Sequence, residues 1–324
     1  REQVAHFVEY GYVVVPGVAS PARLVGARRG LTETLARFGV DAADPDTHGN
    51  LARLSTTHGA GGVLDLFYER WKLDLTLDLP AYADAYRDLL DATYATDAGL
   101  WRHPHGSFDE IRAHVDRVGC RAPDGASLSG RPVQRSLTPH LDCCPDALDA
   151  GGGKRWPRWR PIQCFLALDD ALAPDEGGFE CCPGFHSRFS DYYAARTAAG
   201  GGDALPCVGD YLAVSTKRDA SVLAGFRHVP VPAGAAVFWD QRIPHANARR
   251  NQKSECRRVV YGGFLPRVPR NEAFLKEQRR RLIAGEPQAD FWTKGGGVAA
   301  PPDHAANASA LSPDARSLLG FCDE

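Results

Sequence analysis

The chain has 324 residues, of which 44% are hydrophobic and 24% are charged, and its formal net charge is −2. This composition is that of an ordinary soluble globular protein, and a chain of this length can bury a large core without disulfide bonds. The near-neutral charge gives no support for broad binding to nucleic acid or to a membrane surface, and no apolar run approaches the roughly 20 residues of a membrane span.

Nine cysteines are scattered along the chain. An odd number in a long chain indicates reduced thiols in a cytoplasmic protein. The adjacent pairs Cys143–Cys144 and Cys181–Cys182 lack the spacing of a zinc knuckle, so we expect small, packed side chains there. No secretory signal opens the sequence, but it begins at Arg1 and contains no methionine, which leaves open a removed targeting leader.

The first third of the chain is predicted to be largely helical. Residues 3–10 carry apolar side chains at helical spacing, and the apolar run after them predicts a short buried strand. Ser20 followed by Pro21 is typical of a helix start, because a hydroxyl group caps the first turn and proline fits its first position. Another helix is expected over residues 80–97.

From residue 133 onward, short apolar runs alternate with Gly/Pro turns, which indicates a β-sandwich or barrel. A helix is expected over 271–284, and residues 295–324 are predicted to be a flexible tail. We therefore predict one domain over 1–294, mainly β with flanking helices (an α+β class), with its β core at about 133–268.

Two polar side chains in the stretch "SLTPHLDCCPD" suggest a metal site. His140 and Asp142 are two residues apart, so on a strand both project from the same face and can bind one ion. This triplet is a weak signal alone, but His245 follows an apolar strand far downstream and offers a third ligand. Two histidines and one carboxylate form the facial triad that holds non-haem Fe(II) and leaves other coordination positions open.

Two further segments are "IQCFLALDDALAPDEGGFECCPGFH" (162–186) and "AGAAVFWDQRIPHANARRN" (233–251). With the H-x-D motif, they resemble the phytanoyl-CoA dioxygenase family of Fe(II)/2-oxoglutarate-dependent oxygenases, over roughly 7–265 with a poor match at about 40–130. The resemblance implies a double-stranded β-helix, a jelly roll of the cupin type, with the metal in the barrel mouth. It also implies that His140, Asp142 and His245 are the iron ligands.

The resemblance further implies an arginine that binds the distal carboxylate of 2-oxoglutarate, because a planar guanidinium matches a carboxylate with two hydrogen bonds. The candidates are Arg257 and Arg258. The family's spacing favours Arg257, but a longer gap after the last histidine leaves the choice open, since neighbouring strand residues face opposite ways. Gln163 and Phe165, which share one strand face, are further candidates for the cosubstrate pocket.

The reaction implied by the resemblance uses Fe(II), 2-oxoglutarate and O2 to hydroxylate a C–H bond of a small organic molecule, with release of succinate and CO2. The carboxylate at Asp142 argues against halogenation, because related halogenases have a small residue there so that chloride can bind iron. His103 and His105 of "HPHG", and Trp156 of the basic and aromatic segment 154–160, are candidate substrate contacts. Ordinary loop packing explains these three equally well or better.

Two other functions stay open. A metal-binding jelly roll without catalysis would bind a metal at the same three residues but consume no oxygen with 2-oxoglutarate. A nucleic-acid oxygenase that uses 154–160 would bind with an affinity that falls steeply with salt, and the near-neutral charge disfavours it. We expect a small-molecule substrate and neither nucleic acid nor membrane as a partner. The substrate's identity, its attachment to CoA and the oligomeric state are not encoded in a recognisable motif.

Overall fold

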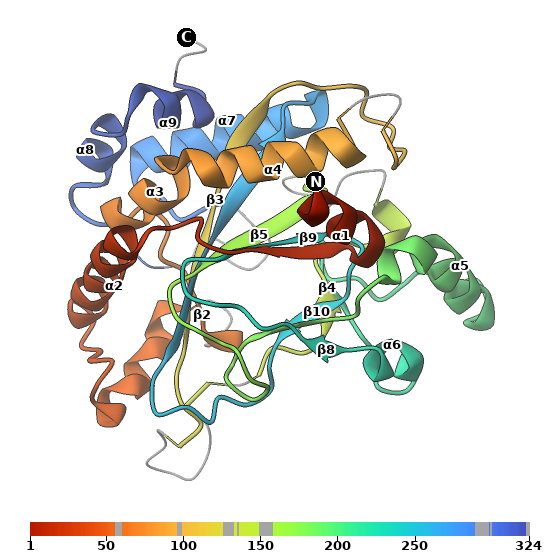
Figure 1. Cartoon of the computed structure of the whole chain (residues 1–324), viewed down its shortest axis with the longest axis horizontal. Helices are drawn as coiled ribbons and strands as arrows, with labels where there is room; N and C mark the ends of the chain where they lie inside the picture. Colours follow the sequence, from red (N-terminus) through yellow and green to blue (C-terminus); the bar gives the residue numbers. More distant parts are fainter. Residues whose placement is uncertain are drawn as a thin grey trace.

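The computed structural model describes residues 1–55, 60–95, 99–125, 133–134, 136–148, 158–288, 298 and 300–321. These residues form a mixed α/β fold in which two antiparallel sheets are flanked by helices (Figure 1). The predicted β sheets and flanking helices are therefore present. Among the described residues, no helix is both long enough and apolar enough to cross a lipid bilayer.

The larger sheet has six strands in the order β1-β9-β5-β11-β3-β2, and the smaller has five in the order β7-β4-β10-β6-β8. The larger sheet consists of β1 (Tyr12–Val15), β9 (Ala236–Asp240), β5 (Ile162–Ala167), β11 (Arg257–Pro266), β3 (Ile111–Arg121) and β2 (Val63–Leu64). The smaller sheet consists of β7 (Leu212–Ala213), β4 (His140–Leu141), β10 (His245–Asn247), β6 (Phe179–Cys181) and β8 (Arg227–His228).

The α-helices are α1 (Glu2–Tyr10), α2 (Pro21–Ala36), α3 (Arg70–Leu77), α4 (Pro80–Thr93), α5 (Phe189–Ala199), α6 (Ala220–Ala224), α7 (Pro269–Ala284), α8 (His304–Ser309) and α9 (Pro313–Leu318). Four 3-10 helices cover Pro45–Leu54, Ala60–Gly62, Pro145–Ala147 and Phe185–Arg188. The predicted start of α2 is confirmed: the Ser20 side chain accepts a hydrogen bond from the Arg23 amide and Pro21 begins the helix. Helices α3, α4 and α7 contact β3 and β11 on one side of the larger sheet (Figure 1).

The larger sheet buries apolar side chains on both faces. One face packs against the smaller sheet through residues such as Phe165, Val237 and Val259, which meet Phe179 of β6. The opposite face packs against the helices through Leu166, Phe238, Val260, Tyr82 and Tyr86. Since successive strand residues face opposite ways, Gln163 and Arg257 share the face between the sheets, whereas Arg258 shares the helix-facing side.

The predicted β core at 133–268 is too short, because β3 is a long strand in the middle of the larger sheet and lies before it. Its face toward the smaller sheet carries polar side chains, including Arg112, His114 and Asp116. They alternate with Ile111, Ala113 and Val115, which is a strand pattern, but a bulge after Val115 shifts the apolar positions to Val118 and Cys120 and so breaks the alternation along the strand.

The C-terminal segment also differs from the prediction of a flexible tail over 295–324. Helices α8 and α9 lie within it. Leu311 between them, Ala315 of α9 and Leu319 at the end of α9 belong to one buried apolar cluster with Phe67 and Leu282. These three residues are spaced four apart, which is the helical repeat, but the surrounding Gly, Pro and Ala residues obscured it. Residues 289–297, 299 and 322–324 of that segment lie outside the described residues.

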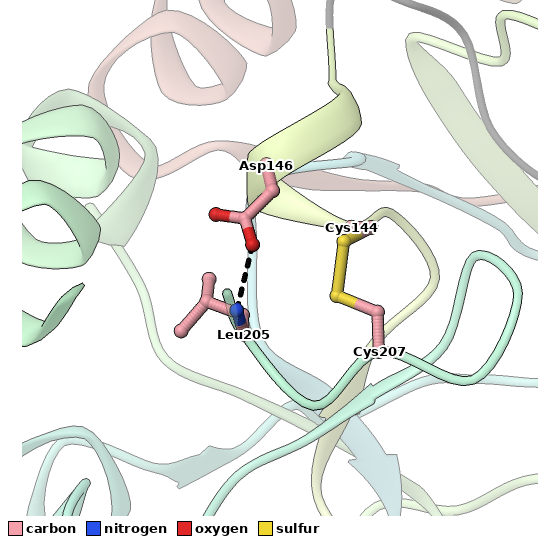
Figure 2. The surroundings of a disulfide bond; sticks show 4 residues. All are labelled: Cys144, Asp146, Leu205 and Cys207. Carbon is pink, nitrogen blue, oxygen red and sulfur yellow. Dashed lines mark hydrogen bonds between the residues drawn. A yellow bond between two sulfur atoms is a disulfide. The ribbon is translucent and has the colours of Figure 1, made fainter. Parts of the chain in front are cut away.

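The prediction that all cysteines are reduced is wrong for one pair. Cys144 and Cys207 form a disulfide bond, with Cα atoms 5.8 Å apart and a sequence separation of 63 residues (Figure 2). Next to it, the Asp146 carboxylate accepts a hydrogen bond from the Leu205 amide at 2.7 Å. Only the fold brings these two segments together, so cysteine spacing could not reveal the bond. A cytoplasmic location stays a prediction.

Candidate metal centre

The structure brings together the three residues predicted to bind metal. Strands β4 and β10 are antiparallel neighbours, and His140 lies directly opposite His245 in their register. Asp142 follows the end of β4 and lies beside both rings. One ligand atom from each of the three side chains lies within 4.8 Å of the other two.

Hydrogen bonds determine which nitrogen of each ring is available. Nδ1 of His140 lies 2.8 Å from the carbonyl oxygen of Thr138, and Nδ1 of His245 lies 3.0 Å from that of Ile243. A carbonyl can only accept, so each Nδ1 carries the proton and each Nε2 is a lone-pair donor. The two Nε2 atoms lie 3.4 Å (His140) and 3.6 Å (His245) from the carboxylate oxygens of Asp142.

The electrostatics favour the metal-binding protonation states. Burial alone would raise the pKa of the Asp142 carboxyl, but its contacts with His140 and then His245 outweigh burial and hold this pKa well below its usual range. Burial lowers the pKa of His245, and the neighbouring His140 lowers it further. A carboxylate and neutral imidazole are the forms that ligate a divalent cation.

The two candidate arginines have different surroundings. The Arg257 side chain is buried, with 2% of its surface exposed. Its guanidinium lies 5.2 Å above the Phe165 ring centroid, and Nη1 donates to Oδ1 of Asn247 at 3.3 Å. No acidic side chain in the described part of the chain pairs with it. Arg258 instead forms a bidentate ion pair with Asp169, through contacts of 2.7 and 2.8 Å.

Two buried N–H groups point to a missing acceptor. Gln163 lies opposite Trp239 in the pairing of β5 with β9, and the Trp239 ring centroid is 5.0 Å from that of His245. Among the described residues, neither Nε2 of Gln163 nor Nε1 of Trp239 has a hydrogen-bond partner. Because buried polar groups are normally satisfied, these two donors suit a ligand that is rich in oxygen acceptors.

Sequence analysis missed several residues of this region. Asn247 lies two residues after His245 on β10, and its side-chain nitrogen donates to Gly61 O at 3.1 Å and to the Tyr261 hydroxyl at 3.2 Å. The same i, i+2 rule that linked His140 to Asp142 could have found Asn247. Tyr211, which stacks on His140 at 4.9 Å between ring centroids, depends on strand pairing that the sequence does not show.

The predicted substrate contacts lie elsewhere. The rings of His103 and His105 pack on Trp159, with centroid distances of 4.3 and 4.7 Å, and Nε2 of His103 lies 2.7 Å from Tyr94 O. Trp159 belongs to the cluster on the helix side of the larger sheet, away from the metal ligands. Trp156 lies outside the described residues. The structure therefore does not bring His103 or His105 to the metal centre.

A small hollow with a volume of about 20 Å³ reaches the metal centre at Asp142. Its lining includes Cys144, Arg160, Asp210 and Gln241, so the disulfide bond lies at its edge. Polar and charged groups thus surround the side of Asp142 that faces solvent.

Comparison with known proteins gives a partial family match. The family model described as Gig2-like matches residues 221–320, a segment that contains His245 and both candidate arginines but not His140 or Asp142. None of the curated proteins compared matches the sequence. The resemblance to the phytanoyl-CoA dioxygenase family is not confirmed by these comparisons.

Similar folds occur among solved structures. GlcNAc Inducible Gene 2 (GIG2) from Candida albicans has a TM-score of 0.70 at 15% identity, over 98% of this chain and 75% of that chain. The "Putative Oxidoreductase" from Salmonella typhimurium LT2 has a TM-score of 0.62 at 15% identity, over 98% and 82% of the two chains. A more distant similarity, with a TM-score of 0.45 and 16% identity over 82% and 87%, is to HygX from Streptomyces hygroscopicus, with nickel and 2-oxoglutarate bound. At these identities the first two matches show the fold alone.

Proposed function

We propose that this chain is an Fe(II)- and 2-oxoglutarate-dependent oxygenase that hydroxylates a C–H bond of a small organic molecule and releases succinate and CO2. One observation carries the proposal. The His140, Asp142 and His245 side chains converge, and Arg257, a buried arginine without a carboxylate partner among the described residues, contacts Asn247 on the strand that carries His245. In this proposal the two antiparallel sheets are the halves of a double-stranded β-helix.

The donor set fits Fe(II). Two imidazole nitrogens and one carboxylate leave positions free for a cosubstrate and for oxygen, and a bound Fe(II) would supply the oxygen activation. The chain's own part is to hold the ligands. Thr138 and Ile243 accept the Nδ1 protons of the two rings and thereby aim each Nε2 toward the carboxylate.

The region around Arg257 fits 2-oxoglutarate. A buried guanidinium without a counter-ion is costly, and the distal carboxylate of the cosubstrate would neutralise it with two hydrogen bonds. Asn247 and the Phe165 ring hold the guanidinium in place. The unsatisfied donors of Gln163 and Trp239 would bind further oxygens of the same molecule. Arg258 is excluded from this role because Asp169 already occupies its guanidinium.

The carboxylate at Asp142 also bears on the type of reaction. It occupies the coordination position that halogenases leave open for chloride, so we propose hydroxylation. The hollow at Asp142, which polar and charged side chains line, marks the side of the metal centre nearest to solvent.

The test is succinate release by the purified protein with Fe(II), 2-oxoglutarate and O2, in a screen of small acids, amino acids and lipids. We expect release that needs all three components and that stops in His140→Ala and Asp142→Ala. The matched control is His186→Ala, which removes another buried histidine, one whose Nε2 lies 3.0 Å from Val8 O. Full turnover in His140→Ala would contradict the proposal. Metal binding without any oxygen consumption would support a non-catalytic metal-binding protein instead.

A further inference from the structure

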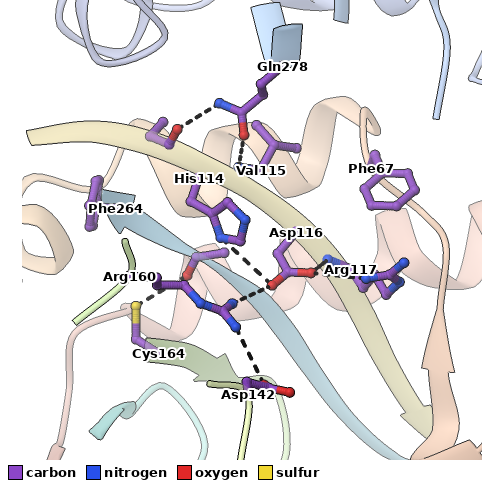
Figure 3. A network of polar contacts seen from close by, with 12 residues as sticks. Phe67, His114, Val115, Asp116, Arg117, Asp142, Arg160, Cys164, Phe264 and Gln278 are labelled. Carbon is purple, nitrogen blue, oxygen red and sulfur yellow. Dashed lines mark hydrogen bonds and ion pairs between the residues drawn. The ribbon is translucent and has the colours of Figure 1, made fainter. Parts of the chain in front are cut away.

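A chain of charged side chains connects the metal centre to the larger sheet (Figure 3). Nη2 of Arg160 lies 3.5 Å from Oδ2 of Asp142, and Nη1 of the same guanidinium lies 3.2 Å from Oδ2 of Asp116. His114 lies next in the chain, with Nδ1 at 3.8 Å from Oδ2 of Asp116. One arginine therefore bridges a metal ligand of the smaller sheet and a carboxylate of the larger one.

A β-bulge places Asp116 in this position. In the pairing of β3 with β11, Val118 is opposite Val260 and Val115 is opposite Gly262. Two residues of β3 therefore oppose one residue of β11, which is the definition of a bulge. The two bulge residues stay close together: the Arg117 guanidinium lies 3.8 Å from Oδ1 of Asp116 and also pairs with Asp65 at 2.6 Å, while Oδ2 of Asp116 contacts Arg160. Bulges that re-aim a side chain are common beside active sites.

The network holds Asp116 as an anion. Burial alone would raise the pKa of its carboxyl, but His114, Arg160 and Arg117 outweigh that effect and hold the pKa far below its usual range. The Arg117 amide also donates to Oδ1 of Asp116 at 2.8 Å, which fixes the carboxylate plane. The Arg160 guanidinium is thus anchored at one end before any metal arrives.

We propose that Arg160, fixed by Asp116, is a positioning residue that holds the Asp142 carboxylate for one-oxygen ligation of the metal. The planar guanidinium is suited to this task, because its separate N–H groups contact two carboxylates in fixed directions. By contacting Oδ2 of Asp142, Arg160 disfavours chelation of the metal by both oxygens and so keeps coordination positions open. This role of Arg160 rests on one part of the proposed function, namely that His140, Asp142 and His245 bind a metal ion.

The alternative is that Arg160 only stabilises the fold as a half-buried ion pair. The two roles differ in their effect on metal binding. A positive charge near a cation repels it, so a purely electrostatic or structural Arg160 predicts that its loss leaves metal affinity unchanged or increases it. A positioning Arg160 predicts the opposite, because second-shell partners of metal ligands typically contribute 10- to 100-fold to metal affinity.

The experiment measures binding of Mn(II) to the full-length apoprotein by calorimetry, together with the visible spectrum of the Co(II)-loaded protein. We expect Arg160→Gln and Arg160→Lys each to weaken Mn(II) binding roughly 10- to 100-fold and to change the Co(II) ligand-field bands. Lysine keeps the charge but offers a single ammonium group, which cannot bridge both carboxylates in this geometry. We expect Asp116→Asn to change both readouts in the same direction and by less.

The matched control is Arg196→Gln, which breaks a buried ion pair of 3.1 Å with Asp219, away from the metal centre. It should lower the stability of the protein and leave both metal readouts unchanged. Wild-type Mn(II) affinity and Co(II) spectrum in Arg160→Lys, or tighter binding in Arg160→Gln, would overturn the positioning role while the metal centre stands. If His140→Ala binds Mn(II) as tightly as the wild type, the metal centre itself fails, and the role of Arg160 fails with it.

Discussion

Arg257 and Arg258 are adjacent in the sequence, but the structure predicts opposite consequences for their removal. We consider replacing each arginine in turn by methionine, which keeps much of the side-chain volume and removes the charge. Among the described residues, buried Arg257 donates a hydrogen bond to the Asn247 amide oxygen and to no carboxylate, whereas the Arg258 guanidinium forms a bidentate ion pair with Asp169. The first substitution should affect ligand binding, and the second should affect folding.

The magnitudes follow from these contacts. Hydrogen bonds to charged groups contribute about 1.5–3 kcal/mol each, so losing the anchor of a carboxylate should cost at least about 3 kcal/mol of 2-oxoglutarate affinity, roughly a 100-fold rise in Kd. The free energy of unfolding of Arg257→Met should change by less than about 1 kcal/mol, because replacing a poorly compensated buried charge with an apolar group is often neutral.

For Arg258→Met we expect normal 2-oxoglutarate affinity and a loss of unfolding free energy of about 2 kcal/mol. Breaking a fully buried ion pair costs about 3–5 kcal/mol, and we discount that figure because Asp169 keeps a second contact, at 3.4 Å from Nε of Arg28, and both partners of the pair keep some exposure.

The assays are calorimetric titration of 2-oxoglutarate into the Mn(II)-loaded protein without oxygen, and urea unfolding of each variant. Normal 2-oxoglutarate affinity in Arg257→Met, with a loss in Arg258→Met, would show that the face assignment of β11 is wrong.

Three further predictions concern the rest of the fold. Cys207→Ser removes the cross-link to Cys144 and should lower the free energy of unfolding by about 3–4 kcal/mol in urea titrations, and an unchanged midpoint would argue against the disulfide. Leu319→Ala should lower it by about 2–3 kcal/mol because this side chain, at the C-terminal end of α9, is buried in an apolar cluster, whereas a flexible tail predicts no change. Burial lowers the pKa of Lys72 to about 7, from about 10.4 in an unfolded chain. Between these pH values the unfolded chain binds more protons than the folded protein, so the free energy of unfolding should rise with pH from about 7 to 10. This rise should be absent in Lys72→Met. An equal slope of unfolding free energy against pH in the wild type and in Lys72→Met would be inconsistent with a neutral buried amine.

The metal ligands could be predicted because their signal is local. Side chains two residues apart share a strand face, which relates His140 to Asp142 without knowledge of the fold. The prediction of His245 as a ligand depended on the resemblance to a known family, because only the pairing of β10 with β4 shows that His245 lies opposite His140. The choice between Arg257 and Arg258 depended on which face of β11 points between the sheets, and one-residue uncertainty in register reverses that answer.

Other features were beyond the sequence for physical reasons. The contact of Arg160 with Asp142 joins side chains from different sheets, and the bulge that aims Asp116 is a property of two paired strands. The same bulge shifts the apolar alternation of this strand from Val115 to Val118, so no single period-two pattern marks its full length. The disulfide bond likewise depends on the fold, which brings Cys207 next to Cys144 although they are 63 residues apart in the sequence.

The most direct measurement of the central claim is a crystal structure of the protein soaked without oxygen in Mn(II) and 2-oxoglutarate, with anomalous data to locate the metal. We predict one Mn(II) ion held by Nε2 of His140, Nε2 of His245 and the Asp142 carboxylate, with the distal carboxylate of 2-oxoglutarate on Arg257. Manganese bound at other residues, or 2-oxoglutarate absent from the metal with Arg257 unpaired, would contradict it.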